Sequence, residues 1–324
     1  MSGNHDHSGA GMPGGMHAGE ASSITRMTAR LSVATAFVLI GLKLWAWLSS
    51  GSVGLLSSLA DSGLDGAASL FTLMAVSYAA MPPDEEHRHG HGKAEGFAAI
   101  VQAMLVGISA TLVAVEAVSR FLAPEPLRQS GLALGVMAVS IVLTLMLITA
   151  QTQAIRKTGS VATTGDRAHY AADLAANFAV IAGIGATAYF GQRWADPLIG
   201  LGVAIWLAFS ALGVARTGLD QLLDRELSDE ARDQIRALAM KPGGLLDVHE
   251  LRTRASGPYV HIQFHADLPA DVSLVEAHQM MVAAERSILT VFPAADVLIH
   301  PDPRGKAEPH GSEAFGGVPQ STDV

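Results

Sequence analysis

The chain has 324 residues, of which 49% are hydrophobic and only 16% are charged, and its net charge at pH 7 is -9. Soluble domains average about 25% charged residues, so charge this sparse indicates membrane-embedded segments. No basic footprint of the kind that binds nucleic acid is present, and we expect no nucleic-acid partner. Because the chain contains no cysteine, any metal must bind histidine and carboxylate side chains.

Residues 1–25 are rich in glycine, serine and histidine and are expected to form a disordered tail. They lack the basic segment, apolar core and small-residue cleavage site of a signal peptide. Weak collection of metal ions by the tail's three histidines is the alternative role.

Six mostly apolar stretches follow, at about residues 27–49, 55–80, 97–122, 130–154, 168–190 and 198–215. A transmembrane helix needs about 20 such residues. We therefore expect a six-span transmembrane domain over residues 26–220.

The positions of lysine and arginine predict the orientation of these spans. If the N-terminus is cytoplasmic, the outside carries only Arg120, Arg128 and Arg193. The inside then carries Arg26, Arg30, Arg88, Lys93, Arg156, Lys157, Arg167, Arg216 and Arg225. This bias predicts that both termini lie in the cytoplasm.

Two of the spans contain ionisable pairs at i, i+4 spacing. These are Asp61 and Asp65 in "DSGLD", and His169 and Asp173 in "HYAAD". Each pair shares one helix face, and ionisable groups at membrane depth are costly and usually functional. Together they offer three carboxylates and an imidazole, a set suited to tetrahedral zinc or a similar divalent ion. The alternative is helix capping or ordinary hydrogen bonding near the interface.

Two further polar residues lie in the spans without a clear role. Asn177 continues the His169–Asp173 stripe and could line a polar path or bond a neighbouring helix. Lys43 could extend its ammonium to the interface or pair with an acid, and we assign it no site role.

Residues 221–305 carry frequent charges and predict a soluble αββαβ domain. Ser228 is the expected N-cap of a helix over residues 228–240. The segments 247–256 and 259–268 alternate with period two as a hairpin around Gly257-Pro258. A second helix is expected over 273–292 and a last strand at "ADVLIHPDP", with residues 306–324 disordered. Alternation places His261 and His265 on one strand face.

The motifs "DSGLD", "HGHGKAE", "HYAAD", "LLDRELSDE" and "DVHELRTRASGP" resemble those of the cation diffusion facilitators, especially the bacterial ferrous-iron/zinc efflux subgroup. The likeness runs from about Arg26 to Pro303. It implies a six-helix membrane bundle with a ferredoxin-like cytoplasmic domain, a homodimer, and a bacterial inner membrane. It also implies that the two intramembrane pairs form the transport site.

The resemblance further implies a second metal site in the loop "PDEEHRHGHGKAE", formed by Glu86, His87 and His91. His89 is an additional histidine, and a solvated cationic turn is the alternative for the whole loop. In similar proteins the lysine that corresponds to Lys93 pairs with the aspartate that corresponds to Asp224, which would join the two domains. A surface ion pair of little energetic worth is the alternative.

A two-metal site in the cytoplasmic domain is also implied. Its residues would be His249, His265, His278, His300 and Asp302. The Asp302 carboxylate could bridge two ions, while His261 has no clear counterpart in the family. Ordinary surface histidines on a small sheet are the alternative.

These features predict a transporter rather than an enzyme. We expect a proton-coupled antiporter that exports Zn(II), or else Fe(II) or Cd(II), with H⁺ as counter-ion and metal also bound at structural or regulatory sites. A membrane-bound metal sensor or scaffold is the main alternative. No G-x-x-x-x-G-K-[ST] stretch is present, so we expect no nucleotide partner. An organic-cation exporter would favour aromatic residues, which are only 6% of the chain.

Overall fold

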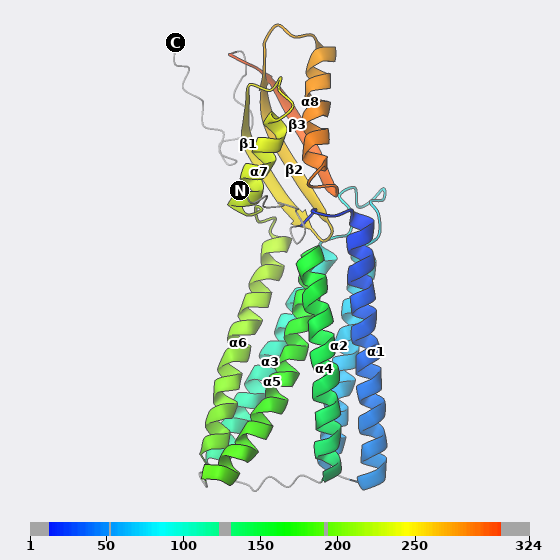
Figure 1. Cartoon of the computed structure of the whole chain (residues 1–324), viewed down its shortest axis with the longest axis vertical. Coiled ribbons are helices and arrows are strands. Elements are labelled where there is room, and N and C mark those ends of the chain that lie inside the picture. The colour runs from blue at the N-terminus through cyan, green and yellow to red at the C-terminus, as the bar shows by residue number, and fades with distance from the viewer. Residues whose placement is uncertain (1–12, 52, 123–130, 191–193, 306–324) are drawn as a thin grey trace, which may run out of the picture.

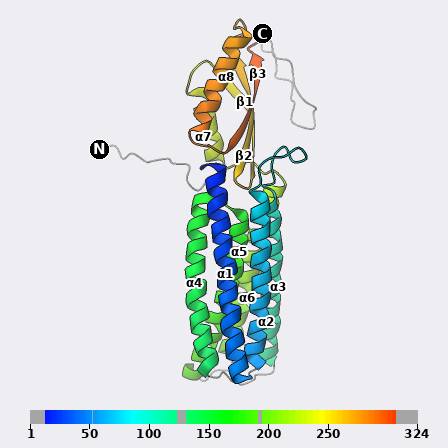
Figure 2. The same cartoon turned by 90° about the vertical axis from the view of Figure 1, so that its right-hand side faces the viewer.

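The computed structural model describes residues 13–51, 53–122, 131–190 and 194–305. It contains a bundle of six long helices, and a small α/β domain stands on one end of that bundle (Figures 1 and 2). Of the two tails predicted to be disordered, residues 1–12 and 306–324 lie outside the described residues.

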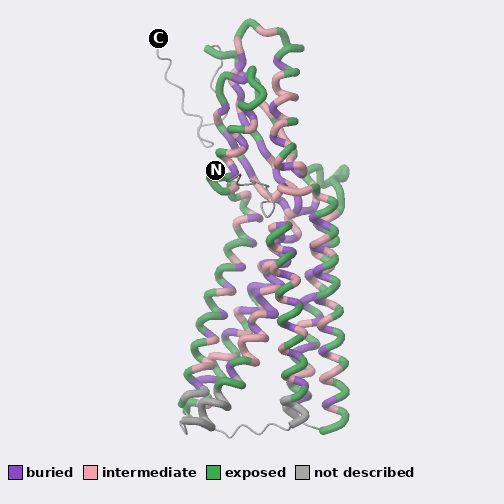
Figure 3. The backbone as a smooth tube through the Cα atoms, in the orientation of Figure 1, coloured by how far each residue is buried: buried purple, intermediate pink, exposed green. Residues whose placement is uncertain are grey.

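The bundle helices are longer than the predicted spans. They are α1 (Ala18–Ser50), α2 (Val53–Ala79), α3 (Ala94–Leu122), α4 (Gly131–Thr158), α5 (Val161–Phe190) and α6 (Ala195–Leu222). Within the described residues, four of them (α1, α3, α4 and α6) contain segments long and apolar enough to cross a membrane. The other two, α2 and α5, carry the predicted ligand pairs. Large apolar side chains such as Leu112 and Phe209 are exposed on the outside of the bundle, as Figure 3 shows for the outward helix faces.

The prediction of a disordered tail over residues 1–25 is wrong for its last part, because α1 begins at Ala18. Ala21 and Thr25 are buried, and the Thr25 hydroxyl donates a hydrogen bond to the Ala21 carbonyl (3.0 Å). Just before the helix, Gly14 packs so closely on Val260 that an added Cβ would lie 2.7 Å from its side chain. Packing therefore orders a segment whose composition alone suggested disorder.

Small residues hold α3, α5 and α6 together. Their shared core contains Ala99, Ala103, Ala168 and Ala172. At the contact of α3 with α6, a Cβ added to Gly218 would lie 2.9 Å from the Gly96 carbonyl oxygen. Such residues let helix backbones approach closely, which is how helices associate in lipid. By contrast, α2 and α5 contact each other much less than α3 contacts α6.

The small domain confirms the predicted αββαβ order. Its elements are α7 (Asp229–Met240), β1 (Asp247–Ser256), β2 (Tyr259–Leu268), α8 (Leu274–Leu289) and β3 (Ala295–Pro303). The sheet order is β1-β2-β3, with β1 antiparallel and β3 parallel to β2. The Ser228 side chain accepts the Ala231 N–H as the predicted cap, and Ser273 with Glu276 forms a capping box on α8.

Both helices cover the same face of the sheet. Val260, Ile262 and Phe264 of β2 point into the core that α7 and α8 close. The alternate residues therefore lie on the uncovered face. Parallel register places His261 opposite Asp296, and His265 opposite His300, across β2 and β3.

The domain is seated on the bundle through the α2–α3 loop. A Cβ added to Gly92 would lie 2.0 Å from the Ser256 carbonyl oxygen, so the loop touches the β1–β2 turn backbone to backbone. Beside this contact, Lys93 Nζ lies 3.0 Å from Asp224 Oδ1, and Arg254 Nη1 lies 3.2 Å from Asp224 Oδ2. A cavity of about 690 Å³ opens at the junction.

Candidate metal centres

The first candidate centre lies inside the bundle, between α2 and α5. His169 Nε2 is 3.0 Å from Asp65 Oδ1, and ligand atoms of Asp65, His169 and Asp173 all lie within 4.8 Å of one another. The His169 side chain is 6% exposed and that of Asp65 is 16% exposed. His169 Nδ1 is buried and has no hydrogen-bond partner in the described part of the chain. Three of the four residues predicted from i, i+4 spacing are thus brought together.

Asp61 is the predicted residue that remains outside this group. It is exposed, one helical turn before Asp65 on α2. Residues at i and i+4 share a face but stand about 6 Å apart along the axis, at about 1.5 Å per residue. A ligand from α5 can therefore contact one of them closely without contacting the other.

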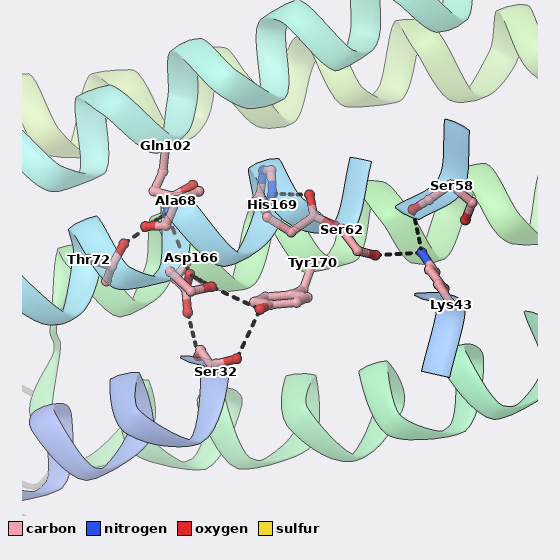
Figure 4. Close-up of polar contacts among 12 residues, drawn as sticks. Ser32, Lys43, Ser58, Ser62, Ala68, Thr72, Gln102, Asp166, His169 and Tyr170 are labelled. Atoms are coloured by element: carbon pink, nitrogen blue, oxygen red, sulfur yellow. Dashed lines mark hydrogen bonds and ion pairs between the residues drawn. The ribbon is translucent and has the colours of Figure 1, made fainter. Parts of the chain in front are cut away.

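Lys43, to which we assigned no role, reaches the same region from α1. Its ammonium donates to Ser62 Oγ (2.6 Å) and to the Ser58 carbonyl (3.2 Å), as Figure 4 shows. Its positive charge also acts on Asp65, Asp173 and Asp61. A fixed cation beside three carboxylates lowers the cost of keeping them ionised in the bundle.

A polar network that the sequence interpretation missed is centred on Asp166, one turn before His169 (Figure 4). Asp166 Oδ2 accepts hydrogen bonds from Ser32 Oγ (2.6 Å) and Gln151 Nε2 (2.8 Å). Asp166 Oδ1 accepts longer bonds from Ser69 Oγ and Gln102 Nε2. The Tyr170 hydroxyl donates to the Ser32 carbonyl (3.1 Å). Serine and glutamine at apolar-helix positions were the signal that could have revealed it.

The second candidate centre is in the α2–α3 loop. His87 and His91 do come together, with ring centroids 4.5 Å apart. The carboxylate beside them is that of Asp84 rather than that of Glu86. Asp84 Oδ1 lies 3.2 Å from His87 Nδ1, and Asp84 Oδ2 lies 3.3 Å from His91 Nε2.

Turn geometry explains why Asp84, rather than Glu86, lies beside the two histidines. The backbone N–H groups of His87 and Glu86 both donate to Asp84 Oδ1, at 2.6 and 3.0 Å. These bonds, above all the one from His87, hold the pKa of the Asp84 carboxyl below its usual value. The turn therefore directs an ionised Asp84 toward the imidazoles, while only the backbone of Glu86 takes part.

The third candidate centre is on the uncovered face of the sheet. Ligand atoms of His249, His265 and Asp302 lie within 4.8 Å of one another, and His265 Nδ1 is 2.9 Å from Asp302 Oδ2. His300 joins this group, with its Nε2 3.5 Å from Asp302 Oδ1. Asp302 is 2% exposed, so its carboxylate is held in place between the imidazoles.

The remaining predicted ligand, His278, is not part of this group. It is exposed on α8, which covers the opposite face of the sheet. The sequence interpretation also omitted Asp267, whose Oδ1 is 3.4 Å from His249 Nε2. Period-two alternation along β2 places Asp267 on the same face as His265, and this pattern could have revealed it.

A helical membrane bundle with a buried Asp–His cluster, joined to a histidine-lined α/β domain, defines a membrane protein with several candidate metal centres. Family models match residues 29–223 as a cation efflux transmembrane domain and residues 227–304 as the cytoplasmic domain of cation efflux proteins. The chain belongs to the cation efflux family.

Curated relatives are similar over most of their length. The cation-efflux pump FieF of Klebsiella pneumoniae is 39% identical over 284 residues, which is 87% of this chain and 94% of the relative. FieF of Yersinia pestis is 40% identical over 272 residues, which is 84% of this chain and 90% of the relative. A solved structure of the Zn form of CzrB, a proposed zinc transporter, is 33% identical with a TM-score of 0.25. It covers 26% of this chain and 98% of its own.

Proposed function

We propose that this chain is a proton-coupled antiporter that exports divalent metal cations from the cytoplasm. The observation that carries the proposal is the buried cluster of Asp65, His169 and Asp173 inside an apolar helical bundle. The similarity to curated cation-efflux pumps supports export. A sensor or scaffold would need no ligands at membrane depth, where they are costly.

The transport step follows from where the ligands lie. The cation enters between α2 and α5 and binds Asp65, His169 and Asp173, with Asp61 as the proposed fourth ligand. These two helices share little packing, so they can shift relative to each other while the tightly packed α3–α6 pair stays intact. The shift opens the site to the outside, and the cation leaves.

Proton exchange uses the same side chains. Carboxylates and imidazole bind metal only when deprotonated, so metal binding releases protons and protonation releases metal. A higher proton concentration outside then favours release there. His169 is the natural exchange group, because an ordinary imidazole titrates near neutral pH.

Zinc is the proposed first substrate, because a mixed set of imidazole and carboxylate ligands suits a tetrahedral ion. Fe(II) and Cd(II) follow, and Mn(II) prefers sites richer in oxygen. The loop and sheet clusters are proposed as further metal sites with a structural or regulatory role.

The orientation and assembly are also proposals. The lysine and arginine bias favours cytoplasmic termini, in a bacterial inner membrane. The match to the cytoplasmic domain of cation efflux proteins agrees with this orientation. We propose a homodimer, in which the exposed His278 is available to a second copy of the chain.

Transport into inside-out proteoliposomes with an acidic lumen tests the proposal. Zn(II), Fe(II), Cd(II) and Mn(II) are offered separately. We expect uptake that depends on the proton gradient and is lost in Asp173→Ala, because the variant removes one ligand of the buried cluster. Glu116→Ala, which removes an exposed acid on α3 outside the cluster, is the control and should transport normally.

If no ion is taken up while metal still binds tightly, the antiporter proposal fails and the sensor alternative replaces it. Uptake of equal size in Asp173→Ala would show instead that the cation crosses elsewhere.

A further inference from the structure

A fourth group of metal-binding side chains lies at the junction of the two domains. His89 comes from the α2–α3 loop, His261 from β2 and Asp296 from β3, and their ligand atoms all lie within 4.8 Å of one another. His89 and Asp296 are 207 positions apart in the chain (296 − 89), yet folding brings all three residues together. The sequence interpretation treated His89 as additional and gave His261 no counterpart in the family.

We propose that His89, His261 and Asp296 form a separate binding site for a divalent cation of the zinc class, which links the membrane bundle to the cytoplasmic sheet.

The spacing of the side chains suits a tetrahedral ion. His261 Nδ1 is 3.1 Å from Asp296 Oδ2. Two ligands of tetrahedral zinc stand about 3.3 Å apart when each bond is about 2.0–2.1 Å long. The His89 and His261 ring centroids are 5.1 Å apart, with the planes nearly perpendicular. Both imidazoles line the junction cavity, which gives an ion a way in.

The state of His261 also favours metal binding. Its side chain is only 13% exposed, and Nε2 is buried without a hydrogen-bond partner in the described ranges. The other three clusters each contain a histidine with the same feature: His91, His169 and His249.

The site is distinct from its neighbours. His261 and His265 lie four residues apart on one strand face, which is about 13 Å at about 3.3 Å per residue. In the loop, His87 and His91 share Asp84, whereas His89 contacts His261. The ligands come from both domains, so an ion here resists their separation, whereas the loop and sheet clusters each lie within one domain.

Metal counting on the full-length protein in detergent tests the site without requiring transport. After equilibration with Zn(II) and with Co(II), bound metal is measured by elemental analysis, and Co(II) is also followed by its visible absorption. We expect His261→Phe and His89→Phe each to bind one equivalent less per chain than the wild type. Gln263→Phe, an exposed change on the same face of β2, should keep the full number.

Two further variants guard against misfolding and against confusion with the loop site. Asp296→Asn keeps the side-chain shape, and we expect the same equivalent to bind more weakly, because a neutral amide is a poorer ligand for a divalent cation than a carboxylate. His87→Ala combined with His261→Phe should lose two equivalents if the sites are independent. The proposal is overturned if His261→Phe or Asp296→Asn retains every equivalent at wild-type affinity. It is equally overturned if the double variant loses no more metal than His87→Ala. Loss of transport with an unchanged number of bound metal equivalents would bear on the antiporter proposal and not on this site.

Discussion

At the scale of single residues, the bundle uses two different solutions for buried acids. Asp65 is paired with His169 at 3.0 Å in the proposed transport site. Asp166 instead accepts hydrogen bonds from neutral donors, chiefly Ser32 and Gln151. The first arrangement can exchange a proton for a cation, and the second fixes α1, α4 and α5 to one another. We therefore expect Asp65 to contribute mainly to transport and Asp166 mainly to the stability of the bundle.

Replacing Asp166 by alanine should destabilise the bundle. The hydroxyl of Ser32 and the amide of Gln151 would each lose a short hydrogen bond, worth about 0.5–1.5 kcal/mol, and would keep only the longer bonds to the Thr28 carbonyl and to Ser32 Oγ. Thermal unfolding in detergent should show a clearly lower midpoint. Glu116→Ala, which removes an exposed acid paired within α3 with Arg120, should leave the midpoint nearly unchanged. Equal midpoints for the two variants would mean that the Asp166 network is not structural.

Residue patterns reveal the site only where a regular element sets the geometry. Helical spacing identified Asp65, His169 and Asp173, whereas the ligands of the sheet cluster were implied by the family resemblance and strand alternation only placed His265 on its face. No such period exists in a turn, so the sequence could not predict that backbone hydrogen bonds place Asp84, rather than Glu86, beside the imidazoles. The pairing of His89 with His261 depends on how two domains meet, which no local pattern encodes.

At the scale of elements, the strands of the small domain were predictable to the residue because hairpin alternation is a local signal, whereas the second helix, expected over residues 273–292, ends at Leu289. The observed bounds of β1, β2 and β3 are those of the predicted segments. The order at the start of α1 was not predictable, since it depends on contacts of Gly14 with the distant Val260. The junction of the α2–α3 loop, α6 and β1 also depends on residues far apart in the chain, because Asp224 pairs with both Lys93 and Arg254.

Two substitutions at Asp224 separate its charge from its backbone shape. Its φ is 56°, a left-handed conformation that asparagine tolerates and that costs alanine about 1–2 kcal/mol. The Lys93–Asp224 pair is 43% and 36% exposed, so losing it costs only about 0–1 kcal/mol. We expect Asp224→Asn to unfold near the wild-type temperature and Asp224→Ala to unfold at a lower one.

Transport by the same two variants tests the proposed coupling of the domains. Both lose the charge that joins Lys93 to Arg254, so metal uptake should fall in both. Normal uptake by Asp224→Asn would show that the Lys93–Asp224 ion pair is not needed for coupling between the domains.

At the scale of the whole molecule, the candidate centres are distributed over the bundle, the junction of the two domains and the open face of the sheet. Three of them lie outside the transport cluster; the junction and sheet clusters join segments far apart in the chain, whereas the loop cluster lies within residues 84–91. A ligand that binds only the folded state stabilises it by mass action, by about 2.7 kcal/mol at a concentration of 100 Kd. Metal should therefore act on the stability of the protein as well as on its transport.

Zinc should raise the unfolding temperature of the full-length protein, and EDTA should reverse the rise. The increase should be smaller in His249→Ala, which removes a ligand from the sheet cluster. Asp271→Ala, an exposed acid outside all four clusters, should respond as the wild type does. A zinc response of equal size in His249→Ala would exclude the sheet cluster as a source of stability.

The limited packing between α2 and α5 has a consequence for the choice of substrate. An ion bound between Asp65 and the pair on α5 is itself a bridge across this weak contact. Each transport cycle must break the bonds between the ion and these ligands. Tighter binding therefore raises the occupancy of the site but lowers the rate at which the ion is released. Cu(II) binds mixed nitrogen and oxygen ligands more tightly than the other divalent ions of its row. We therefore expect the preferred cargo to be an ion of intermediate affinity, and we expect the ion that binds most tightly in a binding assay to inhibit transport.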